Sequence, residues 1–323
     1  MEDNELLNIR LGKIADLKSA GIDLYPNHIK PQNTTAEILD KFASFDEDAL
    51  TRVTETFAIS GRLMAVRNFG KAAFIKIQDY KGQLQGYIGK NTLSADDYFV
   101  FKKLDMGDII YISGKVFRTK TNELTIEVRK LNLLSKSIRP LPEKWHGLTD
   151  IETRYRQRYL DLIANPKVKE IFHRRSRIIK LIRQFMDERD FLEVETPMMQ
   201  PRAGGAAARP FKTHHNALDT DFYLRIAPEL YLKRLVTGGL ERVYEINRNF
   251  RNEGISTFHN PEFTMMEFYQ SYSTYEDLMS FTEDLFAFLA QDIFGGLKFN
   301  YQNTEIDLTP PWRRISVKEA LLQ

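Results

Sequence analysis

Apolar residues in the first part of the chain change from a helical spacing to a strand-like one. From Leu7 to Leu17 they recur every three or four residues and Gly21 follows, which predicts a helix that ends near this glycine. From about 55 to about 135, short runs rich in β-branched and aromatic residues are separated by turn signals such as Lys81-Gly82. The strands predicted there are Phe57–Met64, Ala73–Gln78, Gln83–Ile88, Ile109–Phe117 and Leu124–Val128.

A further helical stretch, around Ala95–Lys103, lies between the third predicted strand and the fourth. Five strands with a helix at this place are typical of an OB-type barrel, and a small sandwich is the alternative. Pro140, Pro142 and Gly147 then suit a linker. We therefore expect residues 1–142 to form an N-terminal helix with an all-β barrel, and residues 143–323 to form a second domain.

The apolar pattern of the second domain predicts helices and strands mixed with long loops. An amphipathic helix covers Ile171–Arg189, and a strand at Phe191–Val194 ends before Pro197. This mixture favours an α+β domain on an antiparallel sheet.

Two Ser-x-x-Glu capping boxes predict helix starts near the end of the chain. Ser273 and Glu276 begin a helix that ends at Gly295, and Ser316 and Glu319 begin another about two turns before the last residue. A short terminal helix and a chain cut inside a helix both fit the second box.

Composition and charge restrict the class of protein. The 323 residues predict about two domains, and the 42% hydrophobic content excludes a disordered chain. A net charge of +2 excludes a generally basic nucleic-acid-binding protein, so any polyanion must meet a local patch. The absence of cysteine excludes disulfides and thiolate metal sites. The sequence has no signal-type segment and no apolar run of the ~18–20 residues that a membrane span needs, so we expect a soluble, cytoplasmic protein.

Chemistry gathers in a predicted hairpin, whose strands are Arg242–Phe250 and Phe263–Tyr269. Side chains alternate faces along a strand, so aromatic, carboxylate and phenol groups of the second strand share one face. If that face coincides with the one that leads to Arg251, a single surface offers groups for a phosphate, a purine and an ammonium ion. An ordinary amphipathic hairpin with a solvated polar face is the alternative. The residues that would share this face are Glu245, Asn247, Asn249 and Arg251, from the first strand to the start of the loop, and Phe263, Met265, Glu267 and Tyr269 on the second strand.

The hairpin string from Phe250 to Tyr269 resembles motif 2 of the class II aminoacyl-tRNA synthetases, and its details resemble the lysine-specific members. Phe191–Pro197 resembles motif 1, the dimer-interface motif that ends in a proline. Other segments similar to the lysine enzymes are Asp150–Leu162, Gly204–Phe211, Thr213–Ala217 and Leu224–Lys233. The resemblance implies a homodimer that ligates L-lysine to its tRNA with ATP, through a lysyl-adenylate, on a class II catalytic domain.

The resemblance also implies a role for each matching residue. Arg251 would be catalytic, because it would hold the ATP α-phosphate and stabilise the charge that develops there. His259 would approach the γ-phosphate, Phe263 would stack under the adenine, and Glu229 would receive the lysine α-ammonium. The whole ATP set is Arg251, Glu253, His259, Asn260 and Phe263, and the lysine set is Gly205, Glu229, Glu267 and Tyr269.

The barrel would read the anticodon of the tRNA. Sequence-specific readers of RNA stack on unpaired bases and bond to their edges. Taken alone, Phe69 and Phe74 are interpreted as barrel core. The resemblance instead gives Phe74 a stacking role, and the matching positions that would contact the anticodon uridines are Arg67, Phe74, Gln85 and Glu123.

The third motif of the family does not occur in these residues. It would supply a second ATP-binding arginine and the acids that hold Mg²⁺, so we expect no metal site here, a piece of a longer enzyme, and no activity from the chain alone. His214 and His215 lack further ligands at metal spacing and are interpreted as loop residues. Lys233-Arg234 is interpreted as a solvated helix face or a contact for the tRNA acceptor end.

Three other readings compete with the lysine enzyme. A paralogue that attaches a lysine-type amino acid to an elongation factor would lack the barrel. Aspartate or asparagine ligases would need cations in their pockets and lack the Asn260–Glu267 string. The third is a non-catalytic RNA-binding or regulatory protein derived from a synthetase.

Overall fold

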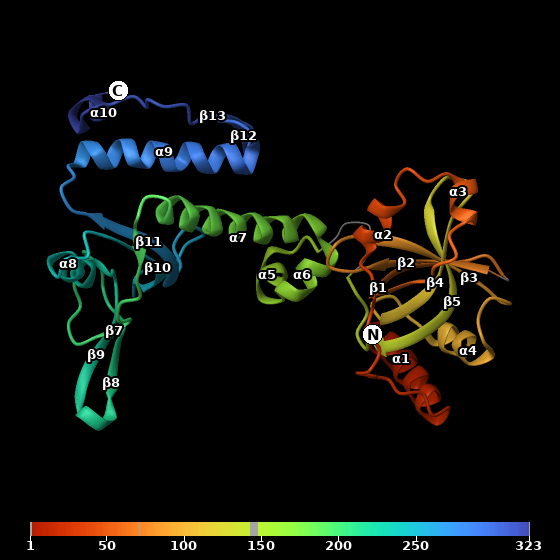
Figure 1. Ribbon diagram of the computed structural model, residues 1–323. Coiled ribbons are helices and arrows are strands. Elements are labelled where there is room, and N and C mark those ends of the chain that lie inside the picture. Colours follow the sequence, from red (N-terminus) through yellow and green to blue (C-terminus); the bar gives the residue numbers. More distant parts are fainter. Residues whose placement is uncertain (1, 71, 143–147, 323) are drawn as a thin grey trace. The chain divides into compact units, whose positions relative to one another are not determined.

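The computed structural model describes residues 2–70, 72–142 and 148–322, and it divides into two units, Met1–Asn165 and Pro166–Gln323 (Figure 1). Part of the predicted linker, residues 143–147, lies outside the described residues, so the boundary at 142 stays a prediction.

The first unit contains a closed barrel with the strand order β1-β2-β3-β5-β4. Neighbouring strands are antiparallel except for β3 and β5, and the pairing of β1 with β4 closes the barrel. The predicted strands and the helix between the third and fourth are therefore confirmed, and the small sandwich is excluded. The elements are β1 (Phe57–Asn68), β2 (Ala72–Gln78), β3 (Gln83–Gly89), α4 (Ala95–Lys103), β4 (Ile109–Arg118) and β5 (Leu124–Ser135).

Period-two burial fills the barrel with branched aliphatic side chains. Along β2, Ala73, Ile75 and Ile77 are buried, while the residues between them are half-buried on the outer face. Gly114 stands at a bulge where β4 meets β5, and a Cβ there would lie 1.8 Å from the carbonyl oxygen of Glu127. Only glycine permits this close approach.

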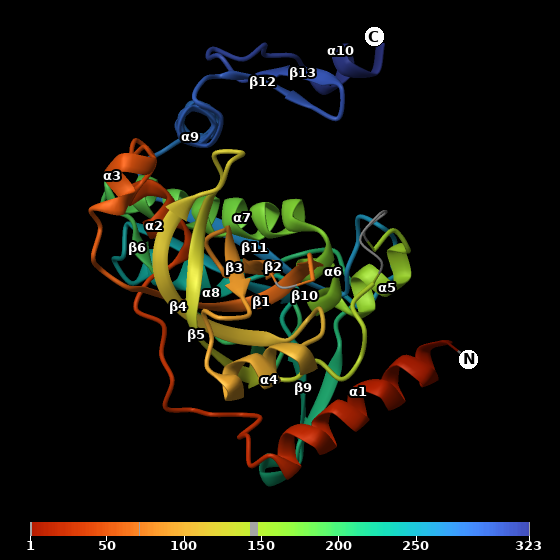
Figure 2. The ribbon, with the colours of Figure 1, turned by 90° about the vertical axis from the view of Figure 1, so that its right-hand side faces the viewer.

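The first unit also contains helices outside the barrel. The predicted N-terminal helix is confirmed as α1, and Gly21 follows it with a φ of +72°. Figure 2 shows α1 beside α4, and the α1 side chain of Arg10 donates to the carbonyl oxygen of Ser137 at 2.7 Å. The helices are α1 (Glu2–Ser19), α2 (Thr35–Lys41), α3 (Glu47–Thr51), α5 (Ile151–Arg156) and α6 (Arg158–Ala164).

The second unit packs two long helices on one face of a sheet with the order β11-β10-β6. The predicted antiparallel sheet is correct for β10 and β11 but wrong for β6, which pairs with β10 in parallel, so the sheet is mixed. The chain goes from β6 to β10 through a long connection, and such a crossover permits parallel pairing. The elements are α7 (Pro166–Asp187), β6 (Leu192–Glu193), β10 (Arg242–Phe250), β11 (Glu262–Gln270) and α9 (Tyr275–Phe294).

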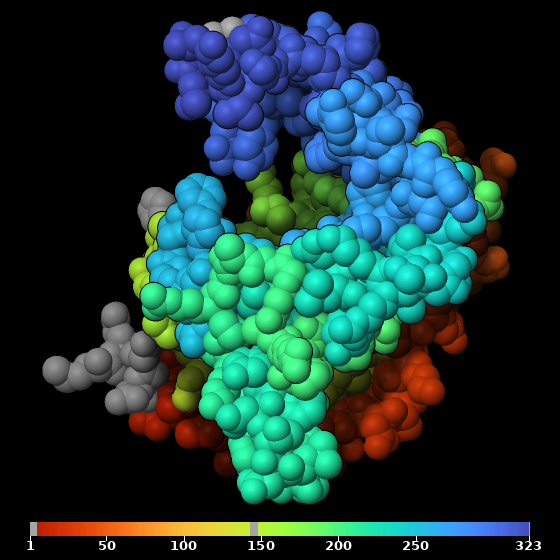
Figure 3. Space-filling model, turned by 90° about the vertical axis from the view of Figure 1, so that its left-hand side faces the viewer, coloured from red at the N-terminus to blue at the C-terminus, as the bar shows by residue number. Residues whose placement is uncertain are grey.

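The remaining elements of this unit form smaller layers. The strands β8 and β9 make a hairpin that projects as a lobe in the space-filling view (Figure 3). These elements are β7 (Met199–Gln200), β8 (Lys212–His215), η1 (Asn216–Leu218), β9 (Thr220–Leu224), α8 (Glu229–Thr237), β12 (Lys298–Tyr301), β13 (Thr304–Asp307) and α10 (Val317–Leu322).

One of the two predicted capping boxes is displaced. The box of α9 is formed by Thr274 and Asp277, one residue after the predicted pair. Tyr272 has a φ of +61°, and Thr274 has the extended backbone of an N-cap. The box of Ser316 and Glu319 is confirmed by bonds from each backbone N–H to the other side chain.

Candidate nucleotide and amino-acid site

The register of the β10–β11 hairpin decides which side chains share a face. Glu245 is opposite Glu267, and Asn249 is opposite Phe263. Directly opposed residues of an antiparallel pair lie on the same side of the sheet, so the two predicted faces do coincide. We call this side, with Arg251 at its end, the ligand face. The opposite side carries Tyr244, Ile246, Met266 and Phe268, which pack in the core of the unit.

A cavity of about 310 Å³ lies in the loop that joins the two strands. All members of the predicted ATP set line it, and Phe258, which sequence reasoning did not select, lines it too. The guanidinium carbon of Arg251 lies 5.2 Å from the centre of the Phe263 ring. Its buried Nε has no hydrogen-bond partner among the described residues. The cavity therefore combines a cation with donors to spare and an aromatic face.

Hydrogen bonds fold the loop around this cavity. The backbone N–H of Arg251 donates to the carbonyl oxygen of Pro261 at 2.9 Å, which closes the loop at its base. Nδ1 of His259 lies 2.8 Å from the hydroxyl oxygen of Ser256. Glu253 accepts a bond from the backbone N–H of Arg209 at 3.4 Å, so the loop is also tied to the segment that precedes β8.

The predicted lysine set forms two pairs of neighbours. A Cβ on Gly205, whose φ is +89°, would lie 3.1 Å from Cβ of Glu229, so this glycine lets the backbone pass close to the carboxylate. On β11, the phenol of Tyr269 donates to Oε1 of Glu267 at 2.7 Å. Burial raises the pKa of the Glu267 carboxyl, and burial and this hydrogen bond raise the pKa of the Tyr269 phenol.

Lys233 lies near both pairs. It is exposed, as predicted for a solvated helix face, but Nζ lies 2.5 Å from Oε1 of Glu229 and 5.9 Å from the centre of the Tyr269 ring. Its charge also acts to lower the pKa of Glu267. The structure thus brings an ammonium group to the acids that sequence reasoning assigned to an ammonium-bearing substrate.

Glu245, one of the residues of the ligand face, forms a buried ion pair. Nη1 of Arg225 lies 2.7 Å from Oε1 of Glu245, and each side chain is 1% exposed. The hydroxyl of Thr196 donates to Oε2 of Glu245 at 2.6 Å. Sequence reasoning missed Arg225 and Thr196. The available signal was an arginine between Leu224 and the apolar pair Ile226–Ala227, where only a buried partner permits a charge.

A row of aromatic rings lies on the outside of the barrel. Ring centres are separated by 6.1 Å from Phe69 to Phe74, 5.2 Å from Phe74 to Tyr87 and 6.0 Å from Tyr87 to Phe117. Phe69 is 66% exposed and Phe74 is half-buried on the outer side of β2, so the interpretation of both as barrel core is wrong. We call these four residues the aromatic row.

The other predicted anticodon residues lie beside this row. Arg67 pairs with Phe74 in the register of β1 and β2, and Lys76 pairs with Gln85 in that of β2 and β3. The amide of Gln85 donates to the hydroxyl of Thr125 at 3.0 Å. Oε1 of Glu123 lies 3.6 Å from Nζ of Lys76. The structure therefore groups the predicted set on one outer face.

Comparisons with known proteins identify the family. Residues 150–323 match the tRNA synthetases class II (D, K and N), and residues 57–134 match the OB-fold nucleic acid binding domain. The chain belongs to the class II tRNA synthetases. The resemblance seen in motif 2 and the OB-type barrel are both confirmed by these matches.

Individual relatives of this class II synthetase chain share one name. This chain is 56% identical over 320 residues to the lysine–tRNA ligase of Carboxydothermus hydrogenoformans. The matched region covers 99% of this chain and 64% of that protein. The chain is 55% identical over 318 residues to that of Pelotomaculum thermopropionicum, with 98% and 62% covered, and 52% identical over 322 residues to that of Coxiella burnetii, with 100% and 64% covered. The chain thus spans a little under two thirds of these relatives.

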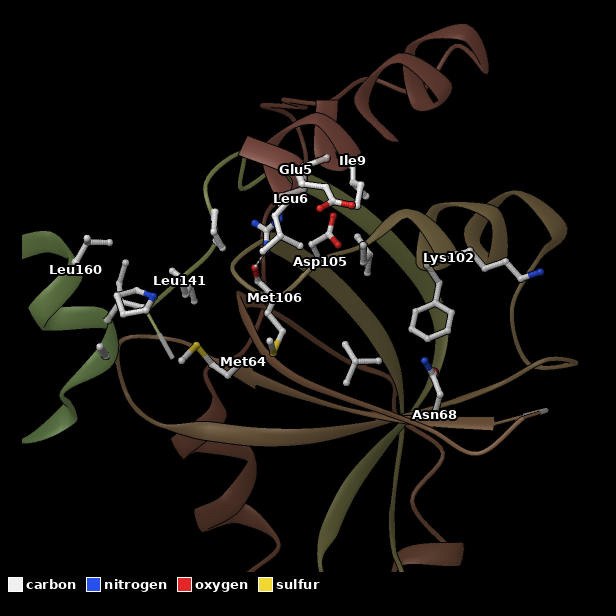
Figure 4. A pocket seen from close by; sticks show the side chains of 18 of the residues that line it. Glu5, Leu6, Ile9, Met64, Asn68, Lys102, Asp105, Met106, Leu141 and Leu160 are labelled. Carbon is white, nitrogen blue, oxygen red and sulfur yellow. Dashed lines mark hydrogen bonds between the residues drawn. The ribbon is translucent and has the colours of Figure 1, made fainter. Parts of the chain in front are cut away.

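A second cavity of the synthetase chain is lined by none of the predicted site residues. This cavity of about 1610 Å³ lies in the first unit between α1 and the barrel, where Leu6, Met64 and Asp105 line it (Figure 4). His214 lies 3.3 Å from Asp221 on the β8–β9 hairpin. In the described ranges no three His, Cys, Asp or Glu side chains could hold a metal ion together. No helix in the same ranges is both long and apolar enough to cross a membrane.

Proposed function

We propose that the protein ligates L-lysine to its tRNA in two steps, through a lysyl-adenylate. The observation that carries this proposal is the hairpin register, because it puts Phe263, Glu267 and Tyr269 on one face that ends at Arg251. An aromatic face suits a purine, a guanidinium suits a phosphate, and carboxylates suit the two ammonium groups of lysine. The names of the relatives support the same choice of amino acid.

In the first step the lysine carboxylate attacks the α-phosphorus of ATP, and pyrophosphate leaves with the electrons of the broken P–O bond. Both reactants are anions, so catalysis depends on neutralising charge and aligning the two groups. Arg251 would hold the α-phosphate and stabilise the added negative charge. Phe263 would stack under the adenine, with Asn260 and Glu253 beside it, and His259 would lie toward the γ-phosphate.

In the second step a ribose hydroxyl at the tRNA 3′ end attacks the lysyl carbonyl, and AMP leaves. Glu229 would hold the α-ammonium next to Gly205, and Glu267 with Tyr269 would hold the ε-ammonium. A polar pocket of this kind rejects analogues that leave its buried groups unpaired. Mg²⁺ is the metal expected with ATP in this family. In the described ranges the acids form no cluster that fits it, so none of the residues named for these two steps is assigned to hold it.

The barrel would select the tRNA, and a second copy of the chain would complete the assembly. Phe74 would stack on an anticodon base, while Arg67, Gln85 and Glu123 bond to the bases around it. Leu192 and Met199, in and just after the motif 1 region, are 51% and 58% exposed, which suits an apolar contact between two copies. Such an enzyme would act in the cytoplasm, together with its tRNA.

The test measures lysine-dependent exchange between ATP and labelled pyrophosphate, then charging of tRNA, with the protein expressed from its natural gene. We expect exchange with lysine and not with aspartate or asparagine. Exchange with either of those acids, or tRNA binding without any exchange, would reject the proposal. Transfer to an elongation factor in place of tRNA would support the paralogue.

A further inference from the structure

Lys233 is placed to control the carboxylate that receives the substrate. Glu229 begins α8, and Lys233 follows one turn later on the same side of the helix. Its ammonium lies 2.5 Å from Oε1 of Glu229, and the side chains are 55% and 30% exposed. Taken alone, this contact is an ordinary surface ion pair of the i,i+4 kind.

The second carboxylate oxygen of Glu229 faces a different group. Oε2 would lie 3.7 Å from a Cβ built on Gly205, where the glycine has no side chain. Among the described residues, Oε2 accepts no hydrogen bond, while Oε1 accepts the one from Lys233. The two oxygens therefore have separate surroundings, one with a protein cation and one beside the open side of a glycine.

The Lys233 ammonium also lies between the two predicted parts of the pocket. It is 5.9 Å from the centre of the Tyr269 ring, and the Tyr269 phenol is bonded to Glu267. The carboxylates of Glu229 and Glu267 repel each other, which acts to raise the pKa of Glu267, and Lys233 opposes that effect. The lysine side chain therefore reduces repulsion between these acids and holds one of them in a fixed direction.

We propose that Lys233 is a positioning residue, which holds Oε1 of Glu229 so that Oε2 points to the space beside Gly205 and meets the substrate α-ammonium there. The inference depends on the proposed function, because it assigns that ammonium to Glu229. Lys233 itself does not touch the substrate, and it stays on Oε1 when lysine binds.

The test compares Lys233→Met, which keeps length and removes charge, with wild-type protein in lysine-dependent pyrophosphate exchange. We expect the lysine KM to rise by about three- to tenfold, the range for losing a charge-assisted contact that is half exposed. The kcat and the ATP KM should stay within about twofold, and Lys233→Arg should recover most of the loss. Arg234→Met is the matched control, because Arg234 is on the same helix but its guanidinium lies over the Tyr231 ring.

A second ligand separates positioning from other roles. ε-Aminocaproate has the carboxylate and ε-ammonium of lysine but no α-ammonium, so its inhibition constant should be the same for wild type and Lys233→Met. An equal rise for both ligands would overturn the inference in favour of a general effect on the pocket. An unchanged lysine KM would leave only a surface ion pair, and a lower KM would show that Lys233 competes with the substrate; each result overturns the proposal.

Failure of the proposed function would be detected in the wild-type protein, not in the variant. It would appear as a lack of lysine-dependent exchange in the wild-type protein, and that result would overturn both proposals. Failure of the positioning role alone would appear only when wild-type protein activates lysine and the variant matches it.

Discussion

The candidate sites of the barrel and of the hairpin differ in how their side chains relate to the buried core. The aromatic row lies outside an apolar core, and its rings are exposed or half-buried. The ligand face includes Glu245, whose ion pair with Arg225 is almost fully buried. In the barrel, the side chains proposed for recognition differ from those that form the core. In the hairpin, the ligand face shares Glu245 with the buried ion pair that stabilises the fold.

This difference follows from what each site has to do. A base stacks on a ring that remains accessible, so the barrel needs only a stable platform with open faces. A transferring phosphate needs charges that are already fixed before the reaction and shielded from water. Polar groups buried for that purpose must be fully paired, which makes them part of the fold. Substitutions in the aromatic row should therefore change binding without changing stability, whereas substitutions in the buried network of Arg225 and Glu245 should change activity and stability together.

The largest expected effect is on stability, from Glu245→Ala. It removes the partner of a buried guanidinium, and uncompensated buried charges of this kind cost about 3–5 kcal/mol. We expect the free energy of unfolding of the second unit, measured by urea denaturation, to fall by that amount. Asp292→Ala is the control, because its ion pair with Arg177 is exposed and should contribute less than about 1 kcal/mol.

If both variants lose a similarly small free energy of unfolding, the buried ion pair does not stabilise the fold, and the proposed difference between the hairpin and the barrel is wrong. The variant that replaces both Arg225 and Glu245 with apolar residues sharpens the test. It removes both charges together, so it should recover much of the stability lost in Glu245→Ala.

Arg251→Ala should give the next largest effect, on chemistry alone. Removing one preorganised group that stabilises developing charge costs roughly 10²–10³-fold in kcat. The loss should appear in pyrophosphate exchange, while the urea midpoint stays near that of wild type, since Nε of Arg251 has no partner to lose among the described residues. Arg248→Ala, on β10 just before Arg251, removes an exposed contact with Glu262 and should keep normal exchange. Normal exchange in Arg251→Ala would refute its catalytic assignment.

In the barrel, Phe74→Ala should affect tRNA and nothing else. Stacking of one base contributes about 1–3 kcal/mol, so kcat/KM for tRNA charging should fall by roughly 5- to 150-fold. Pyrophosphate exchange should be unchanged, because the ring is outside the barrel core. Ile75→Ala is the contrasting variant: Ile75 is 1% exposed, and its truncation should lower stability. Equal losses of charging and exchange in Phe74→Ala would mean that this ring supports the fold.

Periodicity predicted those parts of the structure that depend on neighbours along the chain. The faces of the hairpin and the strands of the barrel follow from alternation, and both are confirmed. Alternation alone does not say which face of β2 points inward, so the pattern by itself places Phe74 in the barrel core, whereas the resemblance gives it a stacking role. The network of Thr196, Arg225 and Glu245 joins residues up to 49 positions apart, and no local pattern carries that information. The parallel pairing of β6 with β10 was not predicted for the same reason, because it joins residues far apart along the chain.

The smallest expected effect is a shift in a pH profile, and it tests how far burial controls the ligand face. The pKa of Glu267 is raised above 4.5 chiefly by burial, so this carboxyl takes up a proton at a higher pH than an ordinary glutamate. Protonation removes the charge that would hold the lysine ε-ammonium. Lysine affinity, measured by calorimetry, should therefore fall as the pH decreases toward that raised pKa.

Stability should change in the opposite direction over the same interval. A carboxyl whose pKa is raised in the folded state destabilises the fold while it is ionised, and this penalty is relieved as the pH falls through the raised pKa. The contribution of Glu267 to unfolding should therefore improve while lysine binding weakens. Tyr269→Phe removes a hydrogen bond that lowers the pKa of Glu267, so its loss of affinity should begin at a higher pH than in wild type. If Tyr269→Phe loses lysine affinity at the same pH as wild type, the phenol does not act through the pKa of Glu267. The hydrogen bond between Tyr269 and Glu267 would then not couple these two residues of the ligand face.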